Sequence, residues 1–403
     1  MKILVAHNSY QQVGGEDQVV AAEIAMLEAH GHEVVPYRLS NHAVEGMSRL
    51  ALGARAIWSR AAFRDLRRLC RAHRPDVAHF HNTLPLISPA AYYAARAEGV
   101  PVVQTLHNFR VCCINSLLFR EGHVCEECLG RTAPWRGILH NCYRGSRAAG
   151  AAITAMVAVH RAVGTWRNGV DAYIALSESS RSKFVHGGLP AERITVKPNF
   201  VYPDPGPGSG HGGYALFVGR LSGEKGVLIL LEAWRRLGGV LPLRIVGNGP
   251  LAAEVAPAAR AGTAEWLREL PRDAVYRLFG EAAFMVLPSQ CYENFPLVII
   301  EAFARGTPAI VSRLGAMAEI VEDGRTGLHF RAGDPDDLAF KVRALAADPA
   351  ALARMRTAAR ETFERKFTAA VNHKAIMAIY ARACARAALP GAESQTCAPV
   401  FKE

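Results

Sequence analysis

Apolar positions in the first half of the chain form short runs that are separated by segments of helix length. The runs are rich in β-branched residues and cover residues 2–6, 32–37, 75–80, 100–106 and 170–176. Between the first two runs, residues 17–30 carry apolar side chains at helical spacing. Strands that alternate with helices predict a parallel sheet with crossover helices. We therefore expect the first half to be a Rossmann-like α/β domain.

The same alternation begins again after residue 213. Four further runs are each followed by a helix-like segment, at residues 214–219, 242–247, 282–288 and 307–312. The segment 202–213 between the two halves is dense in Pro and Gly, and we expect it to be a linker with little to pack. The predicted division is residues 1–204, residues 205–380 and a terminal helix end with a frayed tail at 381–403. We expect the C-terminal helix to cross back to the first domain.

Composition narrows the class of protein. The 403 residues are half hydrophobic and about one fifth charged, which is typical of a folded globular protein of two domains. A net charge of +11 favours an anionic partner. The N-terminal apolar run is too short for a signal peptide, and no run reaches the ~18 to 20 apolar residues of a membrane span. We therefore expect a cytoplasmic protein whose nine cysteines are reduced.

Glycine follows a predicted strand at three places. These are Val13 to Glu16 with Gly14 and Gly15, then Gly219 to Gly226, and then Val246 to Pro250 with Gly247, Asn248 and Gly249. Glycine lets backbone amides approach a phosphate, and a following helix N-terminus favours negative charge. In the second loop Arg220 and Lys225 flank the glycines and could offset a diphosphate. Ordinary strand-to-helix turns and a solvated basic turn are the alternatives.

Two glutamates follow the strand at 282–288. Glu293 is predicted in a loop, and Glu301 about a turn and a half into a helix that begins after Pro296. Alone, such a pair could be accidental. Glu293 and Glu301 with Asn294-Phe295-Pro296-Leu297 between them, together with Gly219-Arg220, Lys225-Gly226 and Gly247 to Gly249, resemble the signature of family 4 retaining glycosyltransferases. That family has the GT-B fold of two Rossmann-like domains whose parallel sheets face a central cleft.

The resemblance implies roles for individual residues. Glu301 would bind the ribose of a nucleotide-diphosphate sugar, and Glu293 would contact the donor sugar. Arg220 and Lys225 would stabilise the leaving diphosphate, helped by amides around Phe295, Pro296 and Leu297. His107 would approach the transferred sugar, and Gly14 and Gly15 would close over the phosphates. His107 could equally be a hydrogen-bonded histidine of the cleft with no catalytic part.

The same resemblance implies a reaction without a catalytic metal. Two cations and oriented amides can stabilise a leaving diphosphate electrostatically, so no general acid is required. Retention would follow from attack on the face that the diphosphate leaves. Two positions depart from the pattern: Gln290 and Arg268 stand where close relatives would have an acid and a glycine.

Five of the nine cysteines lie between residues 112 and 142, inside a segment at 110–145 that lacks clear periodicity. A Cys-x-x-Cys pair flanked by further cysteines has the spacing of a tetrahedral zinc site. The predicted ligands of a structural zinc are Cys113, Cys125, Cys128 and Cys142, with Cys112 as a substitute for the first. An iron–sulfur cluster, a redox pair and metal-free buried thiols are the alternatives. The insertion follows His107, so we expect it to shape acceptor binding.

Arginines recur through residues 49–74, in a stretch that also holds Trp58 and Phe63. Such a helix could lie on an anionic membrane, although a solvated helix face explains it almost as well. With the apolar segment 148–163, it suggests a saccharide or polyprenyl-linked acceptor at the inner face of the cell membrane, in surface-polysaccharide synthesis. The alternatives are a catalytically silent sugar-nucleotide-binding subunit and a zinc-containing nucleic-acid-binding protein. The paired glutamates have no part in binding a phosphate backbone, so we expect no nucleic acid.

Overall fold

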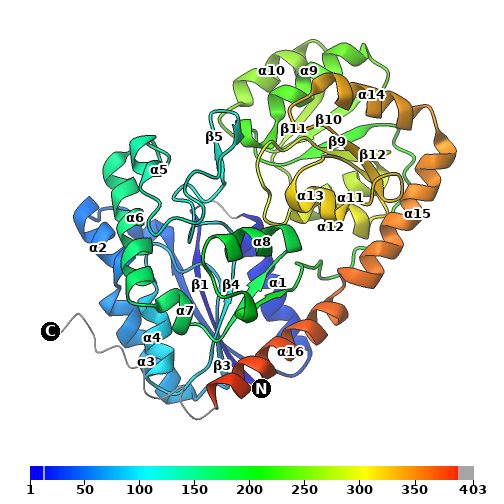
Figure 1. Ribbon diagram of the computed structural model, residues 1–403. Helices are drawn as coiled ribbons and strands as arrows, with labels where there is room; N and C mark the ends of the chain where they lie inside the picture. The colour runs from blue at the N-terminus through cyan, green and yellow to red at the C-terminus, as the bar shows by residue number, and fades with distance from the viewer. Residues whose placement is uncertain (12–13, 389–403) are drawn as a thin grey trace. The chain divides into compact units, whose positions relative to one another are not determined.

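The computed structural model describes residues 1–11 and 14–388 (Figure 1). The chain divides into two compact units. Unit 1 comprises residues 1–116, 126–197 and the chain from His373 onward, and unit 2 comprises residues 117–125 and 198–372. The last helix therefore returns to the first unit, as predicted. The expected division at 204/205 lies seven residues after this one, and the expected tail falls mostly beyond residue 388, outside the described residues.

Unit 1 is built on a six-stranded parallel sheet in the order β2-β1-β3-β4-β7-β8. In that order the strands are Glu33–Ser40, Lys2–Ser9, Val77–Phe80, Val102–Thr105, Ala172–Ala175 and Ile194–Val196. All four residues of β3, β4 and β7 are buried. Strands that are buried on both faces read as continuous apolar runs, which is why the hydrophobic pattern located them.

The helices of unit 1 connect these strands. They are α1 (Gly15–Ala29), α2 (Arg49–Ile57), α3 (Arg60–His73), α4 (Ala90–Arg96), α5 (Arg136–Leu139), α6 (Arg147–Ala162), α7 (Thr165–Asn168) and α8 (Glu178–His186), with 3-10 turns η1 (Asn41–Val44) and η2 (Ala191–Arg193). The part of α16 (Ala369–Ala387) from His373 onward also belongs here. Side-chain oxygens of Ser59 and Ser146 cap α3 and α6. No helix in the described part of the chain is long and apolar enough to cross a bilayer.

Unit 2 has its own six-stranded parallel sheet in the order β11-β10-β9-β12-β13-β14. In that order the strands are Glu265–Arg268, Leu243–Val246, Ala215–Val218, Phe284–Leu287, Ala309–Ser312 and Gly327–Phe330. The helices are α9 (Val227–Leu237), α10 (Ala252–Arg260), α11 (Arg272–Glu281), α12 (Leu297–Ala304), α13 (Gly315–Ile320), α14 (Pro335–Ala346) and α15 (Pro349–Lys366), preceded by the turn η3 (Gly223–Lys225).

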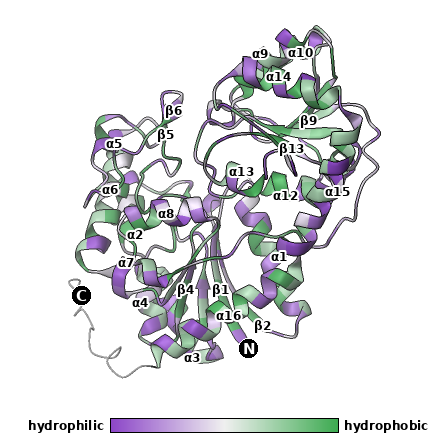
Figure 2. Ribbon diagram, turned by 45° about the vertical axis from the view of Figure 1, so that its right-hand side comes forward, coloured by the Kyte–Doolittle hydropathy of each residue, from purple (hydrophilic) through white to green (hydrophobic). Residues whose placement is uncertain are grey.

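Apolar side chains cover both faces of the second sheet. One core cluster joins Leu216, Met285 and Val311 to α12, and the other joins Phe217, Val286 and Ile310 to helix α9. Figure 2 shows α12 as a mostly hydrophobic helix, in contrast to the mixed surface of α15. Helix α12 is therefore held in place by burial on most of its sides, which matters because it carries Glu301.

The Pro- and Gly-rich segment before β9 packs closely on unit 2, contrary to the expectation that it has little to pack. Backbone amides of Gly208, Gly210 and Gly212 donate to carbonyls of Arg305, Gly280 and Glu281 at 2.8–2.9 Å. The two terminal guanidinium nitrogens of Arg360 donate to the Asp204 carboxylate, at 2.7 and 2.8 Å. A Cβ on Gly208 would lie 2.2 Å from the backbone of Gly280. The absence of side chains thus permits close backbone contact here.

The cysteine-rich insertion is mostly irregular. It contains the two-stranded antiparallel ribbon of β5 (Phe119–Arg120) and β6 (His123–Val124), which is assigned to unit 2, and the short helix α5 of unit 1. Ile114 and Leu118 are buried within it. A Cβ on Gly137 or Gly150 would meet the Ile114 side chain at 2.5 and 3.3 Å, so Ile114 packs against α5 and α6 of unit 1.

Candidate active site

Lys225 and Glu293 form an ion pair at the carboxyl end of the unit 2 sheet. Lys225 Nζ donates to Glu293 Oε1 at 2.6 Å, and Ser289 Oγ donates to the same oxygen at 2.7 Å. Lys225 ends the turn η3 after β9, whereas Ser289 and Glu293 lie in the loop after β12. Burial opposes the charge of Lys225, but the Glu293 carboxylate outweighs it and raises the pKa of the ammonium group. The pair therefore keeps a fixed cation beside a carboxylate.

Close backbone approach between the glycine loops holds this pair in place. Gly226 has φ of +71°, and a Cβ there would lie 1.9 Å from the carbonyl oxygen of Pro288. Gly247 has φ of +133°, and its Cβ would lie 2.0 Å from the carbonyl oxygen of Gly219. Only glycine fits such positions without strain. The loops after β9, β10 and β12 thus converge, as the strand order predicts for parallel strands that end at one edge.

Glu301 lies one turn into α12 and is only 6% exposed. The hydroxyl of Tyr276 donates to its Oε1 at 3.4 Å, and Arg272 Nη2 lies 3.6 Å from the same atom. Burial raises the pKa of this carboxyl, and the nearby arginine only partly offsets the effect. Both contacts are long, so Glu301 retains the capacity to accept stronger hydrogen bonds.

The remaining predicted donor residues line the same edge of unit 2. Arg220 and Asn248 are exposed, and Asn248 Oδ1 accepts from the amide of Gly249 at 2.9 Å. Pro296 is the N-cap residue of α12, Leu297 is its first residue, and Phe295 packs edge-on against Phe367 at 6.0 Å between ring centroids. The amides at this helix start are therefore oriented by packing as well as by helix geometry.

The two departures from the family pattern have local explanations. Arg268 has φ of +57°, a conformation that favours glycine, and its guanidinium stacks over Trp266 at 4.5 Å from the ring centroid. Gln290 donates from Nε2 to the carbonyl of Gly223 at 3.1 Å. In the described part of the chain, neither residue forms a hydrogen bond or ion pair with Lys225, Glu293 or Glu301.

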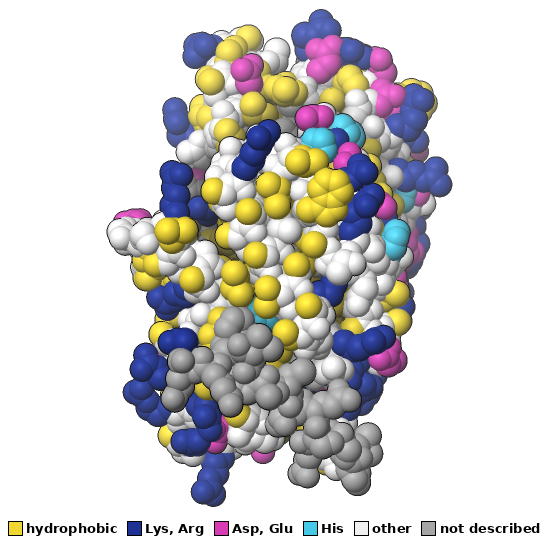
Figure 3. Space-filling view, turned by 60° about the vertical axis from the view of Figure 1, so that its left-hand side comes forward, with side chains coloured by type: hydrophobic (Ala, Val, Ile, Leu, Met, Phe, Trp, Pro, Cys, Tyr) yellow, Lys and Arg dark blue, Asp and Glu magenta, His cyan; other side chains and the backbone are white. Residues whose placement is uncertain are grey.

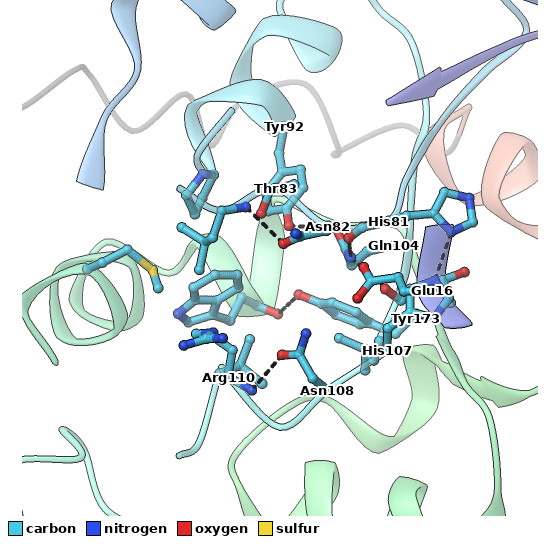
Figure 4. Close-up of a pocket in the computed structure, with 17 residues that line it drawn as sticks. Glu16, His81, Asn82, Thr83, Tyr92, Gln104, His107, Asn108, Arg110 and Tyr173 are labelled. Carbon is cyan, nitrogen blue, oxygen red and sulfur yellow. Dashed lines mark hydrogen bonds between the residues drawn. The ribbon is translucent and has the colours of Figure 1, made fainter. Parts of the chain in front are cut away.

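Unit 1 carries a pocket at the carboxyl ends of β3 and β4 (Figure 4). The cavity has a volume of about 50 Å³. Figure 4 shows Asn82, Thr83 and Tyr92 on one side of it and Asn108 and Arg110 on the other. The pocket is therefore polar at several points and large enough for a small group.

The glycine loop of unit 1 borders this pocket through Glu16. The amide of Gly14 donates to Asp17 Oδ2 at 2.9 Å, and Gly15 begins helix α1. Tyr10 donates to Glu16 Oε2 at 3.1 Å. Burial raises the pKa of Glu16 to about 8. Val13 of the predicted loop lies outside the described residues, so the loop is described from Gly14 onward.

His107 lies at the pocket and connects it to a buried charged cluster. His107 Nε2 is 2.9 Å from His81 Nδ1. His81 Nε2 and His79 Nδ1 lie 3.2 and 3.0 Å from Glu23 Oε1, and Lys197 Nζ lies 3.2 Å from Glu23 Oε2. Glu23, His79, His81 and Lys197, here named the buried cluster, are each at most 2% exposed. Sequence reasoning missed them, although His79 within the apolar run 75–80 and His81 directly after it were an available signal.

The predicted zinc ligands are distributed over both units. Cys113, Cys128 and Cys142 belong to unit 1, and Cys125 belongs to unit 2. Burial first, and then the neighbouring thiols of Cys113 and Cys128, raise the pKa of Cys112 to about 12. In the described residues, one group brings three metal-ligand atoms within 4.8 Å of one another, and it consists of Glu23, His79 and His81 instead of cysteines. The zinc site stays a prediction.

The fold and the site define a class of protein. Two Rossmann-like units, one with a basic glycine loop beside two glutamates, are the architecture of GT-B glycosyltransferases. The chain belongs to the family 4 glycosyltransferases. A family described as "Glycosyltransferase Family 4" matches residues 13–204, and one described as "Glycosyl transferases group 1" matches residues 209–362.

Curated relatives include bacterial synthases. Glycogen synthase of Mycobacterium tuberculosis is 32% identical over 312 residues, which cover 74% of this chain and 66% of that protein. Alpha-maltose-1-phosphate synthase of Mycolicibacterium smegmatis is 31% identical over 249 residues, which cover 53% of this chain and 64% of that protein. The chain thus spans just under two thirds of the length of these relatives.

Solved structures share the fold at low identity. Sucrose-phosphate synthase of Thermosynechococcus elongatus has a TM-score of 0.70 at 16% identity, with 95% of this chain and 99% of that chain covered. HepE of Anabaena in complex with UDP-glucose has a TM-score of 0.67 at 18% identity, with 94% of this chain and 100% of that chain covered. These likenesses support the GT-B fold.

Proposed function

We propose that this protein transfers a sugar from a nucleotide-diphosphate sugar to a saccharide or lipid-linked saccharide, with retention of anomeric configuration. The observation that carries the proposal is the ion pair of Lys225 and Glu293 where two glycine loops, after β9 and β10, converge with the loop after β12. A diphosphate needs cations and amide donors, and a sugar hydroxyl needs a fixed carboxylate. The structures of HepE with UDP and with UDP-glucose support a nucleotide sugar as the donor.

In this proposal each residue has one role. Lys225 and Arg220 bind the diphosphate and stabilise its charge as it leaves, and amides at the start of α12 assist. Glu293 accepts hydrogen bonds from the donor sugar, and Glu301 accepts from the ribose. His107 in unit 1 contacts the transferred sugar. Retention follows when the acceptor attacks from the face that the diphosphate leaves and a phosphate oxygen takes the acceptor's proton.

A surface-polysaccharide role at the inner face of the cell membrane is the finer part of the proposal. The arginines of α3 support it less than the sequence suggested, because Arg67 and Arg71 bind Glu98 and Arg68 binds Asp65. Trp58 is also packed, at 5.3 Å between ring centroids from Tyr93.

The face that bears α2, α5 and α6 supports membrane contact better (Figure 3). Leu50 is 88% exposed, Leu139 57% and Trp135 45%. Figure 3 shows hydrophobic side chains on this face with Lys and Arg side chains at its sides. Apolar side chains flanked by cations suit an anionic lipid surface. A cytoplasmic protein held at the membrane from one side fits this arrangement.

The test is hydrolysis and transfer with a panel of UDP-, GDP- and ADP-sugars, using purified full-length protein. If the protein turns over one nucleotide sugar and Lys225→Ala does not, the result supports the proposed transferase activity. Binding of a nucleotide sugar without turnover, with or without added saccharide acceptors, would support the alternative of a silent binding subunit instead. Retention is read from the anomeric configuration of the product by NMR.

A further inference from the structure

The buried cluster reaches the pocket of unit 1 through His81 and joins elements that are distant in sequence. Glu23 comes from α1, His79 and His81 from β3 and its end, and Lys197 from the residue after β8. Tyr380 of α16 adds a contact of 2.8 Å to His79 Nδ1. His81 is the member that lines the pocket, and it contacts His107, which lines the pocket too. The cluster can therefore act on the pocket through His81.

A neutral imidazole has one N–H donor and one acceptor nitrogen, so a partner at one nitrogen decides the role of the other. His81 Nε2 lies 3.2 Å from Glu23 Oε1, and neither buried atom has another hydrogen-bond partner in the described part of the chain. A lone pair facing a carboxylate at this distance would be repelled, so the proton of His81 is on Nε2. His81 Nδ1 is then an acceptor, and His107 Nε2 must donate to it.

We propose that Glu23, through His81, fixes His107 in the tautomer that carries its proton on Nε2, so that Nδ1 accepts a hydrogen bond from a sugar hydroxyl. The hydroxyl as ligand rests on the proposed function, whereas the tautomer rests on the contacts alone. Glu23 and His81 are positioning residues, and His107 is the residue that touches the sugar. A histidine of this kind selects a ligand group that donates, such as a hydroxyl, over one that only accepts.

The charge state of the histidines agrees with this geometry. Burial, and then the neighbouring His79, lower the pKa of His81 to about 3, and burial with His81 lowers that of His107 well below its usual range. The His7–Asp17 pair also lies near His81, with its imidazole centroid 6.3 Å away. His107 is thus neutral at physiological pH and has one acceptor nitrogen to offer.

A metal ion bound by Glu23, His79 and His81 is the competing interpretation, because their ligand atoms lie within 4.8 Å. A metal on His81 Nε2 would need the lone pair there, which puts the proton on Nδ1 and reverses the tautomer of His107. Two contacts disfavour a metal. Lys197 already supplies a cation to Glu23. Both nitrogens of His79 already have partners at 2.8 Å, Nδ1 the hydroxyl of Tyr380 and Nε2 the hydroxyl of Thr105. The tautomer of His107 therefore distinguishes a metal-free buried cluster from a metal site.

Imidazole nitrogen NMR on the full-length protein, labelled with ¹⁵N-histidine, reads the tautomer directly. The signals of His107 are identified by their loss in His107→Gln. We expect His107 to have a protonated Nε2 and an unprotonated Nδ1, unchanged between pH 6 and 8. A protonated Nδ1 on His107, or stoichiometric metal in the purified protein, would overturn the proposal.

Variants test whether Glu23 and His81 set the tautomer. His81→Leu should let His107 exchange between both tautomers, whereas His81→Gln, whose amide both donates and accepts, should restore a single one. Glu23→Gln is combined with Lys197→Met, since the single change would leave the buried Lys197 unpaired. His160→Gln, a buried histidine bonded to Thr165 and Ile57, is the control and should leave the spectrum of His107 unchanged. An unaltered tautomer in folded His81→Leu contradicts the proposal.

Turnover adds a second readout. With whichever nucleotide sugar the panel identifies, His81→Leu should lower kcat about 10-fold or more and His81→Gln should recover most of it, at unchanged nucleotide affinity. Should no sugar be turned over, the proposed function fails while the NMR result still decides the tautomer. A full loss of activity with an unchanged His107 spectrum would count against the positioning role.

Discussion

Lys225 Nζ lies 2.6 Å from Glu293 Oε1, so the cation expected to bind the diphosphate is already bound by the carboxylate expected to bind the sugar. The two charges offset each other in a site where Lys225 is about one quarter exposed and Glu293 about one eighth. A ligand that carries both a diphosphate and a sugar can compete for both at once. A free sugar can replace only one of the two partners.

This pair gives the first prediction. Lys225→Ala should lower kcat for nucleotide-sugar turnover by about 10²- to 10³-fold, the usual cost of losing one fixed donor at developing negative charge. Glu293→Gln should retain the contact with Ser289 but lose turnover too. The measurement is steady-state kinetics with circular dichroism as a check on folding. Glu254→Gln, an exposed glutamate on α10, is the control, and full activity in both site variants would exclude this site.

Gly226 allows a second prediction on the phosphate loop. Gly226→Ala should destabilise unit 2 by more than ~1 kcal/mol, because the new Cβ meets the Pro288 carbonyl at 1.9 Å and φ is +71°. Gly223→Ala is the matched control, since nothing lies within 4 Å of a Cβ there and its φ is not positive. Urea unfolding compares them. Equal free energies of unfolding for the two variants would contradict the close contact between Gly226 and the Pro288 carbonyl.

Glu16 gives a prediction on pH. Its pKa is raised by burial to about 8, so the unfolded chain loses this proton more readily than the folded chain does. The protonated Glu16 carboxyl contributes fully to the free energy of unfolding below about pH 4.5, and this contribution is lost as the pH rises to about 8. Glu16→Gln should therefore gain stability relative to the wild type across that window, by at most about 1.4 kcal/mol per pH unit. Glu28→Gln on the same helix is the control, and a gap that stays constant with pH would refute the burial of Glu16.

The cysteine cluster gives a prediction on metal content. If Cys113, Cys125, Cys128 and Cys142 bind a structural zinc, purified protein should contain about one zinc per chain, and a chelator should lower its melting temperature. Cys125→Ser with Cys128→Ser should abolish zinc binding, whereas Cys384→Ser on α16 should not. Elemental analysis checks both. If the protein is folded and active without metal, the cysteines are buried thiols that bind no metal.

The linker gives a prediction on packing. Arg360→Ala removes the bidentate contact with Asp204 and should destabilise unit 2 by about 1 to 3 kcal/mol, because Arg360 also bonds the carbonyl of Ala304. Arg354→Ala, an exposed arginine on the same helix, should have little effect. Differential unfolding of the two variants in urea is the measurement. Similar midpoints would indicate that the segment is a loose linker after all.

The amino-acid sequence by itself determined the fold class and one half of the site. Strands buried on both faces give continuous apolar runs, and loops that bind phosphate need glycine and cations at short spacing, so Gly219, Lys225, Glu293 and Glu301 could be found from local pattern and family resemblance. These features are local in the chain, and local chemistry is what a sequence records.

Only the tertiary structure decided the rest. Glu23 and Lys197 are 174 residues apart and each is unremarkable in sequence, yet folding pairs them and joins them to His81. The glycines at 208–212 predicted a linker with little to pack but serve close packing. The arginines of α3 predicted a membrane surface or a solvated face, and three of them bind carboxylates. The partners of Lys197, of the glycines and of Arg67 and Arg71 come from distant segments. What a polar or small residue does depends on which distant segment the fold brings against it.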